Sequence, residues 1–294
     1  MVSQLNLDVG RTDEMSRYGR TSIYPRMQSL LPNDRRETLD LVNYGLAMVD
    51  DELDSSSNPL GHLRDIQQIF QQSYLGSSVR ASTPTEQAVI DLDYALRVLS
   101  SAPFLHFTDK AIGRHTYKEV LNFWEIEKRN FQRRWKVLGK TDLDEINLGI
   151  GALVASQFLY ILDSPRVFNE FTQLAKAYGL AVKLADNLCD FRDDIQKGFV
   201  NIPQENIHHV GGISVKDRRV TQIEPERIAL SAEYIDCEHQ KIEQAFAYAD
   251  RLMLFARARR PIWNRKLDER LYLFGRFCQS WLRQAREFVD VETK

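Results

Sequence analysis

Apolar residues recur every three or four positions along most of the chain, which is the spacing that puts them on one face of an α-helix. The segment 33–54 is typical, with inward positions at Leu39, Leu41, Val42, Leu46 and Val49. No segment repeats the apolar–polar alternation with β-branched residues that a sheet requires. The pattern therefore predicts an all-α protein.

Capping and breaking residues mark the ends of the predicted helices. Thr83 can cap a helix, Pro84 suits its first position, and Glu86 can reach back to complete a capping box. The turn-forming residues in segments 54–61 and 199–220 predict a break and a loop. We expect helices over 33–54, 83–99, 110–137, 142–162, 165–194, 224–257 and 263–289.

No internal repeat or long linker divides the sequence, so we expect one domain over 1–294 with a loose N-terminus at about 1–18. The first residues lack the apolar core of a signal peptide. The longest nearly apolar stretch, 148–162, is shorter than the roughly 20 residues of a membrane span. We expect it to be a buried helix.

Charge and cysteine usage narrow the possible partners and the compartment. The 39 basic residues nearly balance the 41 acidic ones, so no global field attracts nucleic acid, and peripheral contact is the most that we expect with a membrane. Cys189, Cys237 and Cys278 lie far apart without CxxC spacing, which disfavours disulfides and a zinc site. A cytoplasmic location is expected.

Two clusters of aspartate stand out against this neutral background. Asp186, Asp190 and Asp194 follow one another at four-residue intervals, so on one helix they would share a face over roughly 12 Å. A second cluster, Asp50 with Asp51 and Asp54, lies at the predicted C-terminal end of a helix, where the dipole disfavours carboxylates. A solvated acidic surface would explain either cluster alone, but two such clusters in apolar helices favour a bound cation.

The type of cation follows from the ligand chemistry. Carboxylates on two facing helices suit Mg²⁺, which takes oxygen ligands and commonly completes its shell with water and substrate phosphates. The spacing of an EF-hand loop and the Glu-x-x-His pairs of a di-iron bundle are both absent. The sequence therefore predicts Mg²⁺ with a diphosphate ligand.

Two stretches carry a resemblance to a known family. The segments SLLPNDRRETLDLVNYGLAMVDDELD and LADNLCDFRDDIQKGFVNIP resemble the two aspartate-rich motifs of the squalene/phytoene synthases, the head-to-head prenyl synthases. The resemblance implies a single-domain isoprenoid synthase-type helical bundle around a central cavity, and Mg²⁺-assisted ionisation of an allylic diphosphate. It also implies metal-binding or catalytic roles for Asp50, Asp51, Asp54, Asp186, Asp190 and Asp194.

The chain departs from the family pattern at several positions. Ala47 and Cys189 stand where the family usually has arginines that bind diphosphate. Asn201 ends a triplet where the family has Arg-x-Tyr, and the tyrosine expected near the start of the central glycine-rich helix falls near Ile146 or Asn147. The donor half of the chemistry is thus retained in sequence, whereas the acceptor half is altered.

Other residues are candidates for the same site. Arg20 and Lys197 are expected to bind diphosphate, and Lys197 is favoured over Lys183 and over Arg192, which lies about 200° round the helix from the middle aspartate. The small residues Gly149, Gly151, Ala152 and Ala155 would allow either a prenyl chain or a second helix to approach closely. Phe158, Tyr160, Tyr178, Phe274 and Trp281 could face a carbocation, although core packing is the expected role. His208 and His209 are expected to be exposed.

The combined prediction is a divergent Mg²⁺-dependent prenyltransferase. It would ionise a C10–C20 allylic prenyl diphosphate and pass the prenyl group to a small-molecule acceptor, such as an electron-rich aromatic compound. Three alternatives stay open: head-to-head condensation of two prenyl diphosphates, a terpene cyclase with one substrate, and a non-catalytic relative that acts in assembly.

Overall fold

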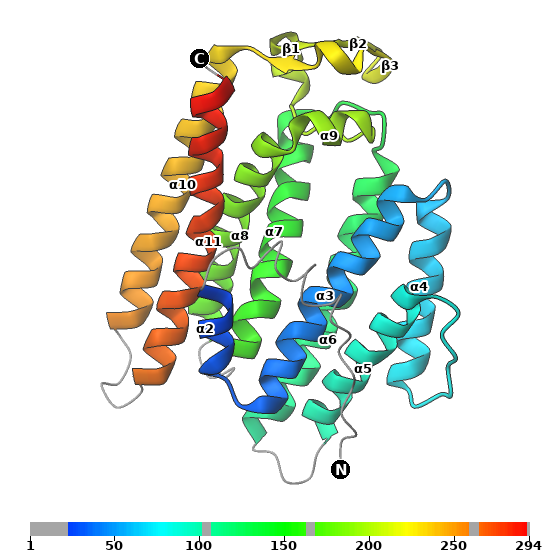
Figure 1. Ribbon diagram of the computed structural model, residues 1–294, viewed down its shortest axis with the longest axis vertical. Coiled ribbons are helices and arrows are strands. Elements are labelled where there is room, and N and C mark those ends of the chain that lie inside the picture. The colour runs from blue at the N-terminus through cyan, green and yellow to red at the C-terminus, as the bar shows by residue number, and fades with distance from the viewer. Residues whose placement is uncertain (1–22, 102–106, 163–167, 259–264, 293–294) are drawn as a thin grey trace.

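The fold is known from a computed structural model that describes residues 23–101, 107–162, 168–258 and 265–292. Helices dominate the described chain, which confirms the all-α prediction. Most of the long helices run along the long axis of the molecule, and α9 with the short strands covers one end (Figure 1). The helices are α2 Ile23–Ser29, α3 Asn33–Ser55, α4 Pro59–Tyr74, α5 Pro84–Ser101, α6 Phe107–Gln132, α7 Lys140–Leu162, α8 Phe168–Cys189, α9 Phe191–Gln196, α10 Ala232–Ala258 and α11 Arg265–Glu292.

Local capping explains where several helices begin. At α5 the Thr83 hydroxyl accepts a hydrogen bond from the Glu86 amide at 3.1 Å, and the Glu86 carboxylate reaches back to the amide of Ser82 rather than to that of Thr83. The sequence prediction missed α4, although Asn58 caps it and Pro59 occupies its first turn.

The predicted helix 165–194 is wrong at one position, because the chain bends at Asp190 and restarts as α9. The predicted helix 110–137 ends early at Gln132, and the predicted helix 224–257 begins only at Ala232. The predicted loop 199–220 instead contains short helical and extended elements. These are η2 Gln204–His209, β1 Val210–Gly211, β2 Ile213–Lys216 and β3 Arg219–Ile223, followed by η3 Pro225–Arg227 and β4 Ala229–Leu230.

The strands form two small antiparallel pairs, β1 with β4 and β2 with β3. A local apolar cluster holds this cap against the bundle and joins α9 to the segments around it. Its members are Val137, Phe191, Ile195, Val200, Ile202, Val210, Ile228 and Tyr234. The cap thereby fixes α9, which carries the last aspartate of the second cluster.

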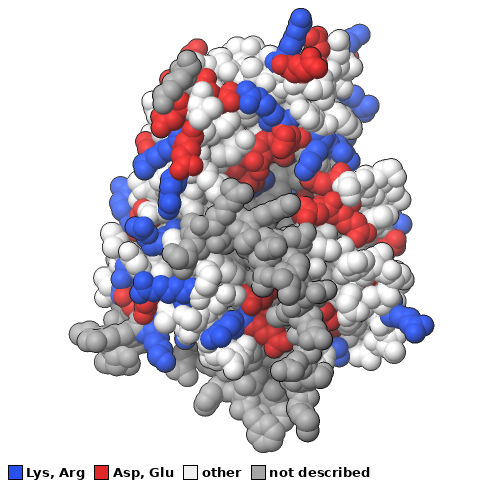
Figure 2. All heavy atoms as spheres, viewed as in Figure 1, with Lys and Arg blue, Asp and Glu red and all other residues white. Residues whose placement is uncertain are grey.

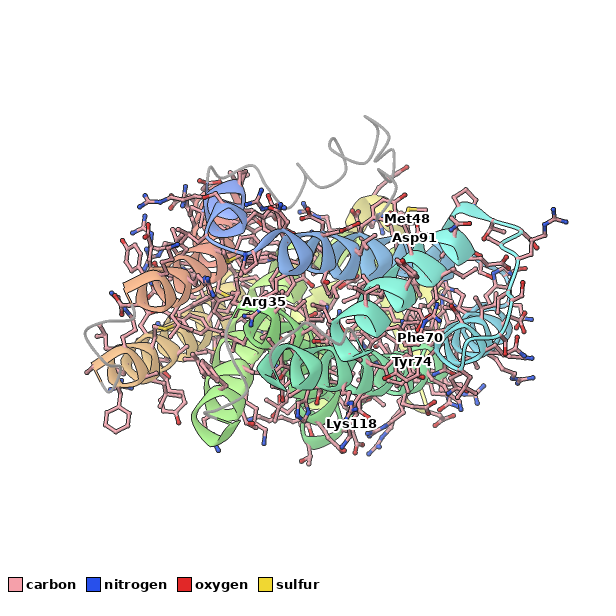
Figure 3. All side chains as sticks on the ribbon, turned by 90° about the horizontal axis from the view of Figure 1, so that it is seen from below. Arg35, Met48, Phe70, Tyr74, Asp91 and Lys118 are labelled. Atoms are coloured by element: carbon pink, nitrogen blue, oxygen red, sulfur yellow. The ribbon has the colours of Figure 1, made fainter. Side chains whose placement is uncertain are left out.

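One continuous apolar core runs from Tyr24 on α2 to Ala285 on α11. At its edge Tyr117 of α6 stacks on Phe70 and Tyr74 of α4, with ring centroids 4.9 and 3.7 Å apart. Phe70 and Tyr74 lie next to each other when the bundle is seen from below (Figure 3).

Helix α7 contains the apolar stretch 148–162 and packs between α6 and α8. By length and composition alone it is the one described helix that could cross a membrane, but 56% of its most apolar window is buried inside the protein. Its closest approach is to α8, where a Cβ atom on Gly151 would lie 2.1 Å from the carbonyl oxygen of Gly179. The two backbones therefore touch, and Gly151 permits this close packing of α7 against α8.

Candidate functional site

A cavity of about 230 Å³ lies between α3, α6, α7, α8 and α11. Asp50 from the first aspartate cluster and Asp186 from the second both line it. In Figure 2 acidic side chains gather on two sides of a hollow in the upper half of the visible face. Two segments more than a hundred residues apart thus contribute carboxylates to one cavity.

The lining is polar at one end and apolar over the rest. The polar lining residues are Asn43, Asp50, Glu127, Lys183 and Asp186. The apolar lining residues are Leu46, Ala47, Phe123, Ile150, Gly151, Val154, Ala155, Phe158, Tyr178, Gly179, Val182, Phe274, Phe277, Cys278 and Trp281. Such a cavity suits a molecule with a polar head and an apolar body. Three acids against the single basic residue Lys183 leave the polar end net negative, so an anionic head would need a cation bound with it.

Asp50 lines the cavity and is exposed to solvent there. Desolvation by the surrounding protein raises its pKa above the usual value, and the negative charges of Glu127 and Asp54 raise it further. The unfavourable environment of the carboxylate would be relieved by a cation.

Lys183 is the cation closest to the second cluster. Its ammonium lies 2.8 Å from the Asp186 carboxylate, and its side chain is only 21% exposed. Burial alone would lower the pKa of Lys183, but Asp186 and Asp194 raise it above the usual value, so the amine stays protonated. The sequence interpretation ranked this residue below Lys197, whereas the structure places Lys183 in the cavity wall.

Lys197 connects the two clusters directly. Its ammonium donates to the carboxylate of Asp54, so the end of α9 is paired with the end of α3. Arg192 points elsewhere, as its helical position predicts, and forms an ion pair with Glu292 of α11 at 2.7 Å. Lys197 is half-exposed and is not itself part of the cavity lining.

The second cluster is bent rather than straight, because α8 ends before Asp190. Burial and the charge of Asp186 raise the pKa of Asp190 to about 6, and burial raises that of Asp194 to about 6 as well. Of the six aspartates only Asp50 and Asp186 line the cavity; Asp54, Asp190 and Asp194 lie outside its lining but interact electrostatically with these two or with one another, whereas Asp51 is exposed. Asp50, Asp54, Asp186, Asp190 and Asp194 therefore form one electrostatic group, and Asp51 lies at its margin.

A buried network supports Asp194 from behind. Asn201 donates to the Asp194 carboxylate at 2.6 Å and accepts from Arg133 at 2.5 Å. Arg133 is 5% exposed and also donates to the carbonyl of Val200 at 3.1 Å. Burial lowers the pKa of Arg133 to about 10. Asn201 thus stands where the resemblance described above would place a tyrosine. Its hydrogen bond holds the carboxylate of Asp194 in position.

Glu127 and Arg133 were missed by the sequence interpretation. Glu127 is 5% exposed and interrupts the apolar stripe that Val120, Phe123, Trp124 and Phe131 form on α6. An acid within an apolar stripe is a signal that could have identified it. Arg133 follows the end of α6, and no local pattern points to its partner Asn201.

The remaining candidates divide into three groups. Phe158, Tyr178, Phe274 and Trp281 line the cavity, whereas Tyr160 does not and lies against His115. His208 is exposed as expected, but the prediction for His209 is wrong, because its ring is partly buried and bonds to the Ser231 hydroxyl at 2.8 Å. Arg20 lies outside the described residues.

Within the described residues, no three His, Cys, Asp or Glu side chains converge closely enough to hold a metal ion by themselves. Two of the carboxylates are instead paired with Lys183 and Lys197. The described side chains thus form no metal site by themselves, and a Mg²⁺ ion would need water or substrate phosphates to complete its shell.

A comparison of the chain with models of known protein families finds no match, and a comparison with curated protein sequences finds none either.

Proposed function

We propose that the protein is a Mg²⁺-dependent prenyltransferase that ionises an allylic prenyl diphosphate and transfers the prenyl group to a second small molecule. The observation that carries the proposal is the shared cavity of Asp50 and Asp186, which is acidic at one end and apolar over the rest. A prenyl diphosphate has the matching division into a charged head and an apolar chain.

The acids would hold the metal on two sides of the diphosphate. Asp50 and Asp54 would act from α3, and Asp186 and Asp194 from α8 and α9. The bound ion would neutralise the diphosphate and make it a better leaving group. Asn201 and Arg133 keep Asp194 in position for this role.

Lys183 and Lys197 would bind the diphosphate oxygens as point charges. Each already pairs with a carboxylate from a different cluster, so a diphosphate bound between the two clusters would have an ammonium on either side to stabilise the charge of the leaving group. They supply positive charge in a site where the family pattern has arginines at positions 47 and 189. A lysine lacks the bidentate grip of an arginine, so the metal carries more of the binding.

The apolar part of the cavity would protect the reaction from water. The allylic carbon–oxygen bond breaks, its electron pair leaves with the diphosphate, and the resulting cation lies near aromatic faces such as Phe158 and Phe274. An electron pair of the acceptor then forms the new bond to the allylic carbon, and the acceptor loses a proton to the diphosphate. The products are the prenylated acceptor and pyrophosphate.

Cavity size favours a single chain over two. If a methylene-sized group takes about the space of one water molecule, roughly 30 Å³, a cavity of about 230 Å³ holds about eight carbons of a chain. Two C15 or C20 chains, as head-to-head condensation requires, exceed this volume. A terpene cyclase that acts on one short diphosphate is the second candidate that the volume favours.

Pyrophosphate release tests the proposal. Purified protein with Mg²⁺ is incubated with C5, C10, C15 and C20 allylic diphosphates, with and without aromatic acceptors. We expect release with the short donors, and loss of most of it in Asp186→Asn but not in Asp193→Asn, an exposed neighbour on α9. Absence of release with every donor would refute a catalytic role, and a cyclic product without an acceptor would identify the cyclase.

A further inference from the structure

A row of three basic residues crosses the small sheet formed by β2 and β3. The hairpin pairs Lys216 of β2 with Arg219 of β3. On the other side of β3, Lys136 pairs with Arg219 in an antiparallel bridge. Directly opposite residues of an antiparallel pair point to the same side of the sheet, with Cβ atoms about 4.5–5.5 Å apart. Three cations therefore follow one another on one face.

The bridge brings Lys136 and Arg219 especially close. The amide of Val137 donates to the carbonyl of Arg218 at 2.8 Å, and a matching bond from Val220 lies on the other side of the pair. A pair flanked in this way is of the non-hydrogen-bonded type, in which the two side chains lie closest. Like charges directly opposite each other destabilise a sheet, so the row costs stability unless an anion neutralises it.

The protein itself does not neutralise the row. Lys136, Lys216 and Arg219 are exposed, and among the described residues none of them forms an ion pair. The Lys136 ammonium instead donates to the backbone carbonyl of Gln132 at 3.2 Å. The one acid of the hairpin, Asp217, is exposed in the turn and does not pair with these cations. The row is therefore open to an external anion.

The hairpin turn adds a fourth cation in a strained conformation. Asp217 and Arg218 have positive φ values of 49° and 61°, as a two-residue turn of this type requires. Glycine adopts such a conformation without strain, yet the chain has an exposed arginine at the second position. Trp135, next to Lys136, also has a positive φ, of 66°, and is 42% exposed. The same region thus displays further charge and an aromatic ring.

The hairpin lies at one end of the molecule, beyond α9 (Figure 1), and basic side chains project at this end (Figure 2). None of the four cations lines the cavity that contains Asp50 and Asp186. A small ligand binds where a concave site encloses most of its surface. An open row of charges on a flat sheet instead suits an extended anionic surface.

The distribution of charge favours a membrane over a nucleic acid. The chain carries a formal charge of −2, and acidic side chains gather around the hollow below this end of the molecule (Figure 2). An extended nucleic acid strand would continue from the hairpin over those acids, whereas a bilayer would touch the end of the molecule alone. Tryptophan and basic residues are also the side chains that suit the interface of an anionic bilayer.

We propose that this end of the protein docks on the phosphate headgroups of an anionic membrane. Lys216, Arg219 and Lys136 bind neighbouring headgroups, and Arg218 adds its charge at the tip of the hairpin. The headgroups neutralise the row and remove its internal repulsion. Each basic residue at an anionic membrane surface strengthens binding by about fivefold, and salt screens the attraction.

Sedimentation with vesicles tests the proposal on the full chain. We expect the protein to sediment with vesicles of phosphatidylglycerol and phosphatidylcholine, to stay in solution with phosphatidylcholine alone, and to be released by high salt. The triple substitution Lys136→Gln, Lys216→Gln and Arg219→Gln should weaken binding by about a hundredfold. If the triple variant does not fold, Arg219→Gln alone should weaken binding by about fivefold.

A charge-matched variant separates the row from net charge. The triple substitution Arg251→Gln, Arg276→Gln and Arg283→Gln removes three exposed arginines from α10 and α11 and should leave binding unchanged. Equal losses in the two triple variants, or no preference for anionic vesicles, would overturn the proposal. So would tighter binding of a single-stranded oligonucleotide than of the vesicles at this row. No substrate is present in the assay, so its failure is distinguishable from failure of the prenyltransferase proposal.

Discussion

The contact between α7 and α8 yields the sharpest stability prediction. A Cβ atom added at Gly151 would lie 2.1 Å from the carbonyl oxygen and 2.4 Å from the carbonyl carbon of Gly179. Both are backbone atoms, so no side-chain rotation relieves the overlap and the helices must separate by about an ångström or more. The substitution Gly151→Ala therefore strains the centre of the bundle.

The magnitude follows from two opposing effects. Overpacking of a core costs typically about 1–3 kcal/mol, and a backbone clash lies at the upper end of that range. Replacing glycine by alanine within a helix recovers about 1 kcal/mol. We expect Gly151→Ala to lower the free energy of unfolding by about 2 kcal/mol.

Gly149 provides a matched control on the same helix. A Cβ atom there would lie 3.2 Å from the Cδ1 atom of Ile126, the flexible end of a side chain that can move aside. We expect Gly149→Ala to raise the free energy of unfolding by up to about 1 kcal/mol, because the helical gain is offset only by a small shift of the Ile126 side chain. Urea unfolding of both variants, followed by circular dichroism at 222 nm, measures the difference. Equal stability of the two variants would refute the close approach of the backbones.

Three further predictions concern the charged residues. Arg133→Met should lower the free energy of unfolding by about 2–3 kcal/mol, because it leaves the carbonyl of Val200 and the carboxamide oxygen of Asn201 without this donor. In the same urea assay Arg129→Met removes only a half-exposed ion pair and should cost under about 0.5 kcal/mol. Lys197→Met should also cost under about 0.5 kcal/mol, yet reduce pyrophosphate release at least tenfold; an unchanged rate would exclude the diphosphate role. Burial raises the pKa of Asp40 from 3.8 to about 6, so its stabilising contribution is complete below about pH 4 and is lost as the pH rises through 6. Asp40→Asn should therefore exceed the native protein in stability at pH 7.5, by about 1–2 kcal/mol, and match it near pH 4 in thermal melts; parallel pH profiles would contradict the assignment.

Local patterns predicted most of the helices, since helix formation depends on residues within four positions of one another. They failed where distant contacts decide the conformation. The short strands of the cap are held by an apolar cluster that extends from Val137 to Tyr234, and such strands have little stability alone. The bend at Asp190 lies where α8 gives way to α9, whose Phe191 and Ile195 are buried in that cluster.

The candidate site shows the same division. The spacing of the aspartates was visible in the sequence, because a four-residue interval has a defined meaning on a helix. The sequence did not show that Asp50 and Asp186 line one cavity together with Glu127 and Lys183. This arrangement depends on how α3, α6 and α8 pack.

The small residues of α7 illustrate the reason most clearly. The sequence by itself determined an all-α chain with two acidic clusters and a helix rich in glycine, all of which follow from local spacing. Only the tertiary structure decided that Gly151 meets Gly179 and that both also line the cavity. A side chain's neighbours across a helix interface come from distant parts of the chain, and their identity depends on crossing geometry and packing that no local spacing contains.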